Sequence, residues 1–187
     1  KKLIVDLQGN PGGYMGAAIY MADELLGGRD LIVSQSGKVT QYSNKAYASK
    51  PGMFEEGSVI ILINEGSASA SEILAGAIQD NDRGLIVGRR SFGKGLVQMP
   101  IDLSDGAELR LTIARYFTPS GRSIQKPYDE GYEAYERDEL TALSKGSISQ
   151  RIASSLTIAS STKPKREEPS MGVEESCQTT LYRLIPR

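Results

Sequence analysis

The sequence predicts an α/β fold with a mostly parallel core, and three observations support this fold class. Residues 58–64 are an uninterrupted apolar run, which is typical of a strand buried on both faces in a parallel sheet. Residues 72–79 have helical spacing and residues 85–88 form another short apolar run, so this stretch has the strand–helix–strand order of a βαβ unit. The length of 187 residues suits one domain with a sizeable core.

The remaining elements follow from the local pattern. Residues 2–7 are expected to form a buried strand because three apolar residues follow one another there. Residues 14–26 have apolar side chains at helical spacing, and Gly27-Gly28 ends that helix. The other expected elements are a strand at 31–34, a more exposed strand at 37–44, a polar loop at 47–57, and strands at 96–103 and 107–118 joined by a turn at 104–106.

The composition excludes several classes of function. The 22 basic and 23 acidic residues leave a net charge of −1, so nucleic acid is not expected as a partner. No apolar run approaches the roughly 20 residues of a membrane helix. The chain contains no histidine and one cysteine, which excludes a Ser-His-Asp triad, a histidine zinc site and an internal disulfide. We expect no metal and no other cofactor, and a base working near neutral pH must be Lys, Asp, Glu or Tyr.

The first candidate site is the segment at 64–72, NEGSASASE, where a buried strand is followed by a turn of small residues and a helix. This order places the Ser69 hydroxyl at a helix N-terminus, where backbone N–H groups stabilise the negative charge that a serine nucleophile generates. The alternative is that Ser69 and Glu72 form an S-x-x-E capping box and that the serine only caps the helix. The pattern alone favours the capping alternative.

The second candidate site is the segment at 88–95, GRRSFGKG, which nearly matches a phosphate-binding P-loop. Gly95 replaces the hydroxyl that would bind magnesium, and residues 96–101 have the pattern of a strand rather than a helix, so phosphate binding is disfavoured. Lys94 could instead act as a base, because Phe92 and Leu96 would desolvate the amine and favour its uncharged form. The alternative is a solvated surface lysine, the commoner case.

The third candidate site is the segment at 6–13, DLQGNPGG, which also lies between an expected strand and an expected helix. Its free backbone N–H groups could supply a second donor to an oxyanion. The alternative is a plain tight turn, which these residues alone favour.

Together these segments resemble the carboxyl-terminal processing proteases, a family of serine endopeptidases with a Ser-Lys dyad. The matching stretches are DLQGNPGG at 6–13, NEGSASASEILAGAIQD at 64–80, GRRSFGKGLVQ at 88–98 and YFTPSGRSIQ at 116–125. The resemblance covers residues 1 to about 140 and rests on separated motifs in the right order. It implies a crotonase- or ClpP-like spiral of ββα units with additional antiparallel strands.

The resemblance also implies the roles of individual residues. Ser69, the middle serine of the S-A-S-A-S run, would be the nucleophile, Lys94 the general base and Gln98 the residue that orients the lysine amine. The backbone N–H groups of Ala70 and Gly12 would form the oxyanion hole, with Gly12 preferred over Gly13. Gln8 replaces the arginine usual in the family, which puts that arginine's ion pair in doubt but not the dyad.

The implied activity is cleavage of proteins or peptides near their C-terminus, in an extracytoplasmic, periplasmic or membrane-associated location. Members usually bind substrates through a PDZ domain, which we do not expect within these 187 residues. The chain opens on an apolar run without an initiator Met, and we therefore expect a piece of a longer protein, with residues 1–140 as a partial catalytic core. The alternatives are a catalytically silent scaffold with the same fold and, less favoured, a nucleotide-binding protein.

Residues 141–187 are rich in Ser and Thr without a clear period, so we expect a weakly folded tail. The tail departs from the resemblance: the residues at 174–180, EESCQTT, can be obtained from codons that encode the family's G-G-I-M-P-D-Y-F segment, when those codons are read one nucleotide out of register. We hypothesise that residues from about 150 onward are a frameshift product. A divergent natural tail is the alternative, and resequencing the gene decides between them.

Overall fold

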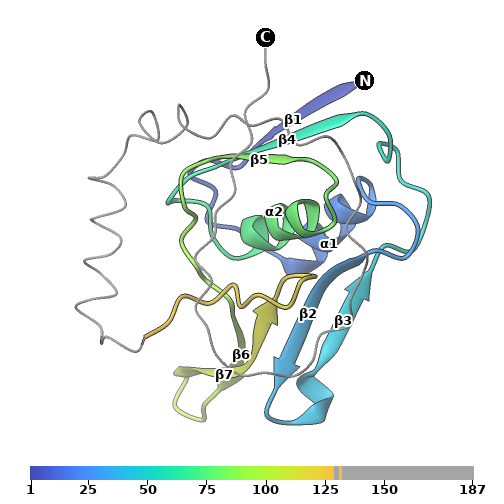
Figure 1. The fold of residues 1–187 in the computed structure, drawn as a ribbon. Coiled ribbons are helices and arrows are strands. Elements are labelled where there is room, and N and C mark those ends of the chain that lie inside the picture. Colours follow the sequence, from blue (N-terminus) through green and yellow to red (C-terminus); the bar gives the residue numbers. More distant parts are fainter. Residues whose placement is uncertain (129–130, 132–187) are drawn as a thin grey trace.

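The computed structural model describes residues 1–128 and 131, and the predicted tail at 141–187 lies outside these residues. Two sheets enclose two helices (Figure 1). The first sheet contains the parallel strands β1 (Lys2–Asp6), β4 (Ser58–Ile63) and β5 (Leu85–Gly88), in the order β1-β4-β5. The parallel core predicted from the sequence is therefore confirmed.

The central position of β4 explains its apolar composition. Val59, Ile61 and Ile63 are buried on one face, whereas Ile60 and Leu62 on the other face are half-buried. Burial is therefore complete on one face only, and the prediction that both faces are fully buried is wrong.

The helices α1 (Met15–Asp23) and α2 (Ala70–Asp80) lie between the two sheets and pack against each other (Figure 1). Every residue of α2 from Ala70 to Ile78 is buried, so this helix is the centre of the hydrophobic core. Both predicted helices are confirmed, although α1 ends three residues before the predicted position and α2 begins two residues earlier. Within the described residues, neither helix is long and apolar enough to cross a membrane.

The second sheet is antiparallel, in the order β3-β2-β7-β6, with β2 at Leu31–Gly37, β3 at Asn44–Tyr47, β6 at Leu96–Asp102 and β7 at Glu108–Phe117. The strand predicted at 37–44 is wrong. The chain must reverse there between β2 and β3, and it does so through the 3₁₀ turn η1 (Thr40–Tyr42), with the Gly37 N–H bonded to Ser43 Oγ at 3.1 Å.

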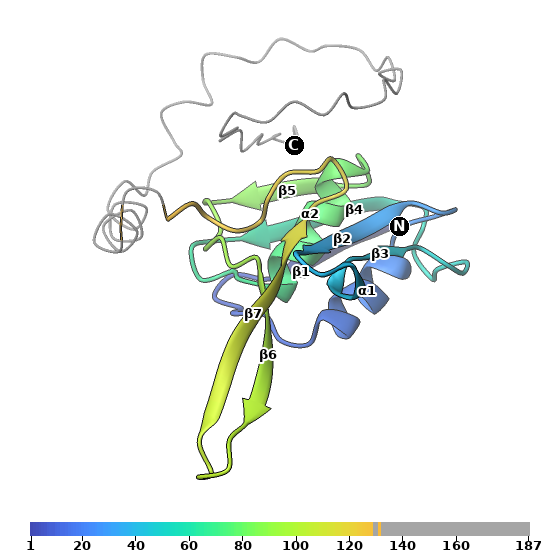
Figure 2. The same cartoon turned by 90° about the horizontal axis from the view of Figure 1, so that it is seen from below.

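Strands β6 and β7 pair along their whole length and project from the body as a hairpin arm (Figure 2). Most side chains toward the tip of this arm are exposed, including Leu103, Leu109 and Leu111. The base of the arm returns to the core through Tyr116 and Ala114, both buried. The structure is thus an α/β fold with additional antiparallel strands, as predicted.

Candidate active site

The three segments singled out in the sequence meet at one edge of the parallel sheet. They follow β1, β4 and β5 respectively, and parallel strands present their carboxyl ends at the same edge. The turn after β4 lies in the middle because β4 is the central strand. Hydrogen bonds join it to both neighbours: Ser67 Oγ donates to the Leu7 carbonyl (2.7 Å), the Ala68 N–H to the Asn10 carbonyl (3.0 Å), and the Phe92 N–H to the Ser67 carbonyl (3.0 Å).

Ser69 immediately precedes α2 and has φ 56° and ψ −115°. A positive φ costs a non-glycine residue about 1–3 kcal/mol and is common at strained functional turns. Ser69 and Glu72 have the capping-box arrangement that the sequence allows, with the Ser69 N–H donating to Glu72 Oε2 at 2.9 Å. The Ser69 hydroxyl faces the Glu72 N–H as in a capping box but forms no hydrogen bond with it, because this N–H donates to the Ser69 carbonyl at 2.9 Å. The hydroxyl therefore remains available at a helix N-terminus.

The two predicted oxyanion donors lie beside Ser69. Ala70 is the first residue of α2, and no hydrogen bond from its N–H is found within the described residues, as is typical of a first helical turn. Gly12 has φ +89°, and a Cβ added to it would lie 2.7 Å from the Ala70 nitrogen and 2.9 Å from Ser69 Cβ. Only glycine fits this position, whereas a Cβ on Gly13 meets open space. The Gly12 N–H currently donates to Asn10 Oδ1 at 2.9 Å.

Lys94 lies in a loop that several other segments hold by its main chain. Its N–H donates to Glu72 Oε2 at 2.8 Å, the same oxygen that accepts the Ser69 N–H. On the other side of the loop, the Gly95 N–H donates to the buried Gln125 Oε1 at 3.0 Å. The Lys94 residue is exposed, so of the two alternatives left open by the sequence the surface lysine describes this structure, and Phe92 and Leu96 do not bury it.

Gln98 is exposed on β6, where it pairs with Thr112 next to an irregularity in the register. Within residues 1–128, no hydrogen bond joins the side chains of Ser69, Lys94 and Gln98 to one another. The structure brings together the main chains that carry the predicted nucleophile and base, and the catalytic roles of the three side chains stay predictions.

Sequence reasoning missed the second role of Glu72. Its carboxylate is 7% exposed and accepts N–H groups from Ser69, Gly93 and Lys94, and it is also hydrogen-bonded to the Ser91 side chain. Burial raises the pKa of Glu72 above its ordinary value, although these hydrogen bonds oppose the increase. The S-x-x-E motif signalled the local contact with Ser69, but nothing nearby in sequence signalled the contacts with residues 93 and 94.

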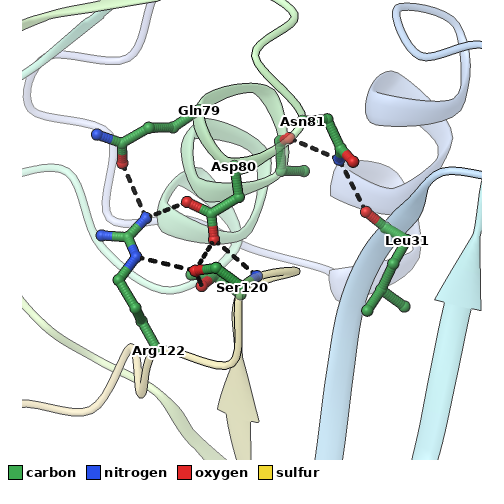
Figure 3. A network of polar contacts seen from close by, with 8 residues as sticks. Leu31, Gln79, Asp80, Asn81, Ser120 and Arg122 are labelled. Carbon is green, nitrogen blue, oxygen red and sulfur yellow. Dashed lines mark hydrogen bonds and ion pairs between the residues drawn. The ribbon is translucent and has the colours of Figure 1, made fainter. Parts of the chain in front are cut away.

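A second polar network, at the other end of α2, was also missed. Asp80 accepts the Ser120 N–H (3.0 Å) and hydroxyl (2.6 Å) and pairs with the Arg122 guanidinium, which also donates to Gln79 Oε1 at 3.0 Å (Figure 3). Burial alone would raise the pKa of Asp80, but hydrogen bonds from Ser120 and Thr118 and the charge of Arg122 hold it below its ordinary value. The network ties the segment at 118–125, which includes Gln125, to α2.

The structure disfavours the P-loop alternative for residues 88–95. Strand β6 begins at Leu96, as the sequence predicted, so the loop is not followed by a helix whose N-terminus would hold a phosphate in a P-loop. Within the described part of the chain, no group of three His, Cys, Asp or Glu side chains is placed to hold a metal ion.

Comparisons with known proteins agree with this geometry. The model of Peptidase family S41 matches residues 1–132. The chain is 43% identical over 147 residues to a carboxy-terminal-processing protease of Bartonella bacilliformis, covering 73% of this chain and 34% of that protein. It is 41% identical over 125 residues to the chloroplastic C-terminal processing peptidase of Tetradesmus obliquus, covering 66% and 26%.

Solved structures of proteases also align with this chain. The photosystem II D1 C-terminal processing protease aligns with a TM-score of 0.60 at 40% identity, covering 66% of this chain and 32% of that one. A putative S41 protease from Bacteroides fragilis shares the fold with a TM-score of 0.57 at 13% identity, covering 74% and 40%. The chain spans about a quarter to a third of the length of the curated relatives it matches.

Proposed function

Because the chain belongs to peptidase family S41, we propose that it is a serine endopeptidase of the Ser-Lys type. The observation that carries the proposal is the position of Ser69. The strained main chain of Ser69 places its hydroxyl at the N-terminus of the buried helix α2. Glu72 Oε2 accepts hydrogen bonds from both the Ser69 N–H and the Lys94 N–H, so the two residues are held by the same atom. The chain contains no histidine, so another residue must act as the base, and the family resemblance assigns this role to Lys94.

In the proposed acylation step, uncharged Lys94 takes the proton of the Ser69 hydroxyl while Oγ bonds to the scissile carbonyl carbon. The N–H groups of Ala70 and Gly12 stabilise the oxyanion, which requires the Gly12 N–H to leave Asn10 Oδ1. The tetrahedral intermediate collapses, the C–N bond breaks, and the Lys94 ammonium returns its proton to the departing amine.

Deacylation uses the same groups. Lys94 takes a proton from a water molecule while its oxygen adds to the acyl carbon. The new intermediate then collapses, the bond from the acyl carbon to Ser69 Oγ breaks, the Lys94 ammonium returns its proton to Oγ, and the product leaves as a carboxylic acid. Gln98, by the resemblance, orients the Lys94 amine. No metal or organic cofactor takes part in these steps.

The proposed substrates are proteins or peptides cut near their C-terminus. Support comes from the curated relatives, which are described as carboxy-terminal-processing proteases. Selection through a PDZ domain, an extracytoplasmic location and the domain limits 1–140 and 141–187 stay predictions.

The test compares the unmodified chain with Ser69→Ala and Lys94→Ala, using a loosely folded protein as substrate and an active-site serine probe. Exposed residues elsewhere provide matched controls, Ser36→Ala on β2 and Lys45→Ala on β3. We expect cleavage and labelling at Ser69 in the unmodified chain and both controls, and a loss of more than about 1,000-fold in the two site variants.

Two outcomes contradict this proposal. Full activity of Lys94→Ala would remove the lysine as the base. A folded unmodified chain that neither cleaves nor labels would favour the silent-scaffold alternative.

A further inference from the structure

We infer that Glu72 is a positioning residue that holds the main chain of Lys94 in register with Ser69. The inference rests on the proposed function, because it gives a reason for the base and the nucleophile to be held by the same group. Glu72 lies one helical turn beyond Ser69, on the buried helix α2, and its carboxylate reaches across to the loop after β5.

The contacts divide between the two oxygens of the carboxylate. Oε1 accepts the Gly93 N–H at 2.7 Å, and Oε2 accepts the N–H groups of Lys94 at 2.8 Å and of Ser69 at 2.9 Å. Three main-chain donors from two distant segments thus converge on one side chain. Capping of α2 requires only the bond to Ser69, and it does not explain the two bonds to Gly93 and Lys94 in the loop after β5 (the lysine loop).

Only a carboxylate satisfies this set of donors. A glutamine has the same length, but its amide offers one acceptor oxygen and two N–H donors, so one edge of the group would face a main-chain N–H with another N–H. Either the Gly93 contact or the shared contact of Ser69 and Lys94 would be lost. The N-terminus of α2 also favours a negative charge at this position.

Positioning through the main chain matters because the Lys94 side chain is exposed. Other hydrogen bonds hold the residues on either side of Lys94: the Lys126 N–H donates to the Gly93 carbonyl (3.0 Å), the Tyr116 N–H donates to the Gly95 carbonyl (2.7 Å), and the Gly95 N–H donates to Gln125 Oε1 (3.0 Å). Among the described contacts, the Glu72 carboxylate is the one that accepts the Lys94 N–H itself and joins it to Ser69. A displacement of about 1 Å at a reacting group costs on the order of 100-fold in rate. Loss of the Glu72 contacts therefore acts on the chemical step rather than on substrate binding.

The test measures three quantities on Glu72→Gln in the full 187-residue chain: kcat and KM for a protein substrate, hydrogen exchange of the Gly93 and Lys94 amides by NMR, and the melting temperature. We expect kcat to fall about 100-fold with KM nearly unchanged. Exchange at one or both amides should become faster. The matched control is Glu55→Gln, in which another carboxylate that accepts a main-chain N–H, from Gly52 at 2.6 Å, is changed away from the site; it should alter neither kcat nor these amides.

Ser91→Ala is the second variant, because it removes only the serine contact to the Glu72 carboxylate and leaves the core unchanged. It should lower kcat in the same direction by a smaller factor, and it keeps the test decisive if Glu72→Gln fails to fold. Unchanged kcat in folded Glu72→Gln, or unchanged exchange at both amides, would overturn the inference. If instead the unmodified chain is inactive, the proposed function fails, and the exchange data alone still decide whether Glu72 holds the lysine loop.

Discussion

The nucleophile and the base of the proposed dyad are held in different ways. Ser69 lies at the start of a helix that is buried from Ala70 to Ile78, so core packing fixes its main chain. Lys94 lies on the surface, and main-chain N–H groups of its loop donate hydrogen bonds to Glu72 and Gln125. The comparison teaches that changes in the core should act on stability, whereas changes in the polar contacts should act on turnover.

Beyond the two dyad residues themselves, the largest effect is expected at Gly12, which lies beside Ser69. Gly12→Ala would place a Cβ 2.5 Å from the Ala68 carbonyl and 2.7 Å from the Ala70 nitrogen at a positive φ, and so displace the oxyanion donors. We expect kcat to fall about 100- to 1,000-fold, the usual cost of losing one such donor.

Two neighbouring glycines provide controls for the Gly12 prediction. Gly13→Ala meets open space and should change kcat little, whereas Gly9→Ala meets open space at φ +67° and tests the effect of backbone strain alone. A Gly13→Ala variant more damaged than Gly12→Ala would reverse the assignment of the oxyanion donor.

The next effect tests the core itself. Ile78 is fully buried on α2, so Ile78→Ala should lower the free energy of unfolding by about 2–5 kcal/mol through lost packing and an unfilled cavity. Below its melting temperature the variant should keep the kcat of the unmodified chain, because Ile78 has no role in the proposed mechanism. Urea unfolding and kinetics measure both, with the exposed Ile4→Ala as control.

A smaller effect is expected from Asp80 at the end of α2. Its contacts with Ser120 and Arg122 tie the helix that begins after Ser69 to the segment whose Gln125 holds the lysine loop. Asp80→Asn should lower the free energy of unfolding by about 2 kcal/mol, less than for a fully buried pair because Arg122 is partly exposed. The pKa of Asp80 is lowered in the folded chain, so its stabilising contribution is present above the usual aspartate value of 3.8 and is lost as the pH falls through the lowered pKa.

Urea midpoints between pH 7 and pH 2 test this dependence. The unmodified chain should lose more stability on acidification than Asp80→Asn, and the exposed Asp82→Asn should behave like the unmodified chain. Equal pH dependence of Asp80→Asn and the unmodified chain would contradict the role of this carboxylate.

The smallest effect is expected in the arm formed by β6 and β7. Glu108 and Arg110 form an exposed ion pair there with an N–O distance of 2.7 Å, and such pairs contribute little. Arg110→Gln should shift neither the melting temperature nor kcat measurably. A clear loss of turnover in this variant would show that the arm takes part in binding or catalysis.

The elements that the sequence predicted well are those with strong local patterns. The apolar run of β4 and the periodic segment of α2 were recognised because the spacing of apolar residues is a local property that distinguishes a strand from a helix. The strand predicted at 37–44 was wrong because the reversal between β2 and β3 depends on how those strands pair, which no local pattern records. The sequence left open whether Lys94 is covered or exposed for the same reason, since exposure depends on which segments pack against it.

The sequence by itself determined that strand–turn–helix units carry small residues at their turns, and that a chain without histidine must use another base. It placed Ser69 and Glu72 in one helical turn because that contact is local. Only the tertiary structure decided that the turns after β1, β4 and β5 meet, because that requires parallel pairing of strands far apart in the chain. It also decided that Glu72 is buried against the lysine loop, since burial depends on which segments the whole fold brings together.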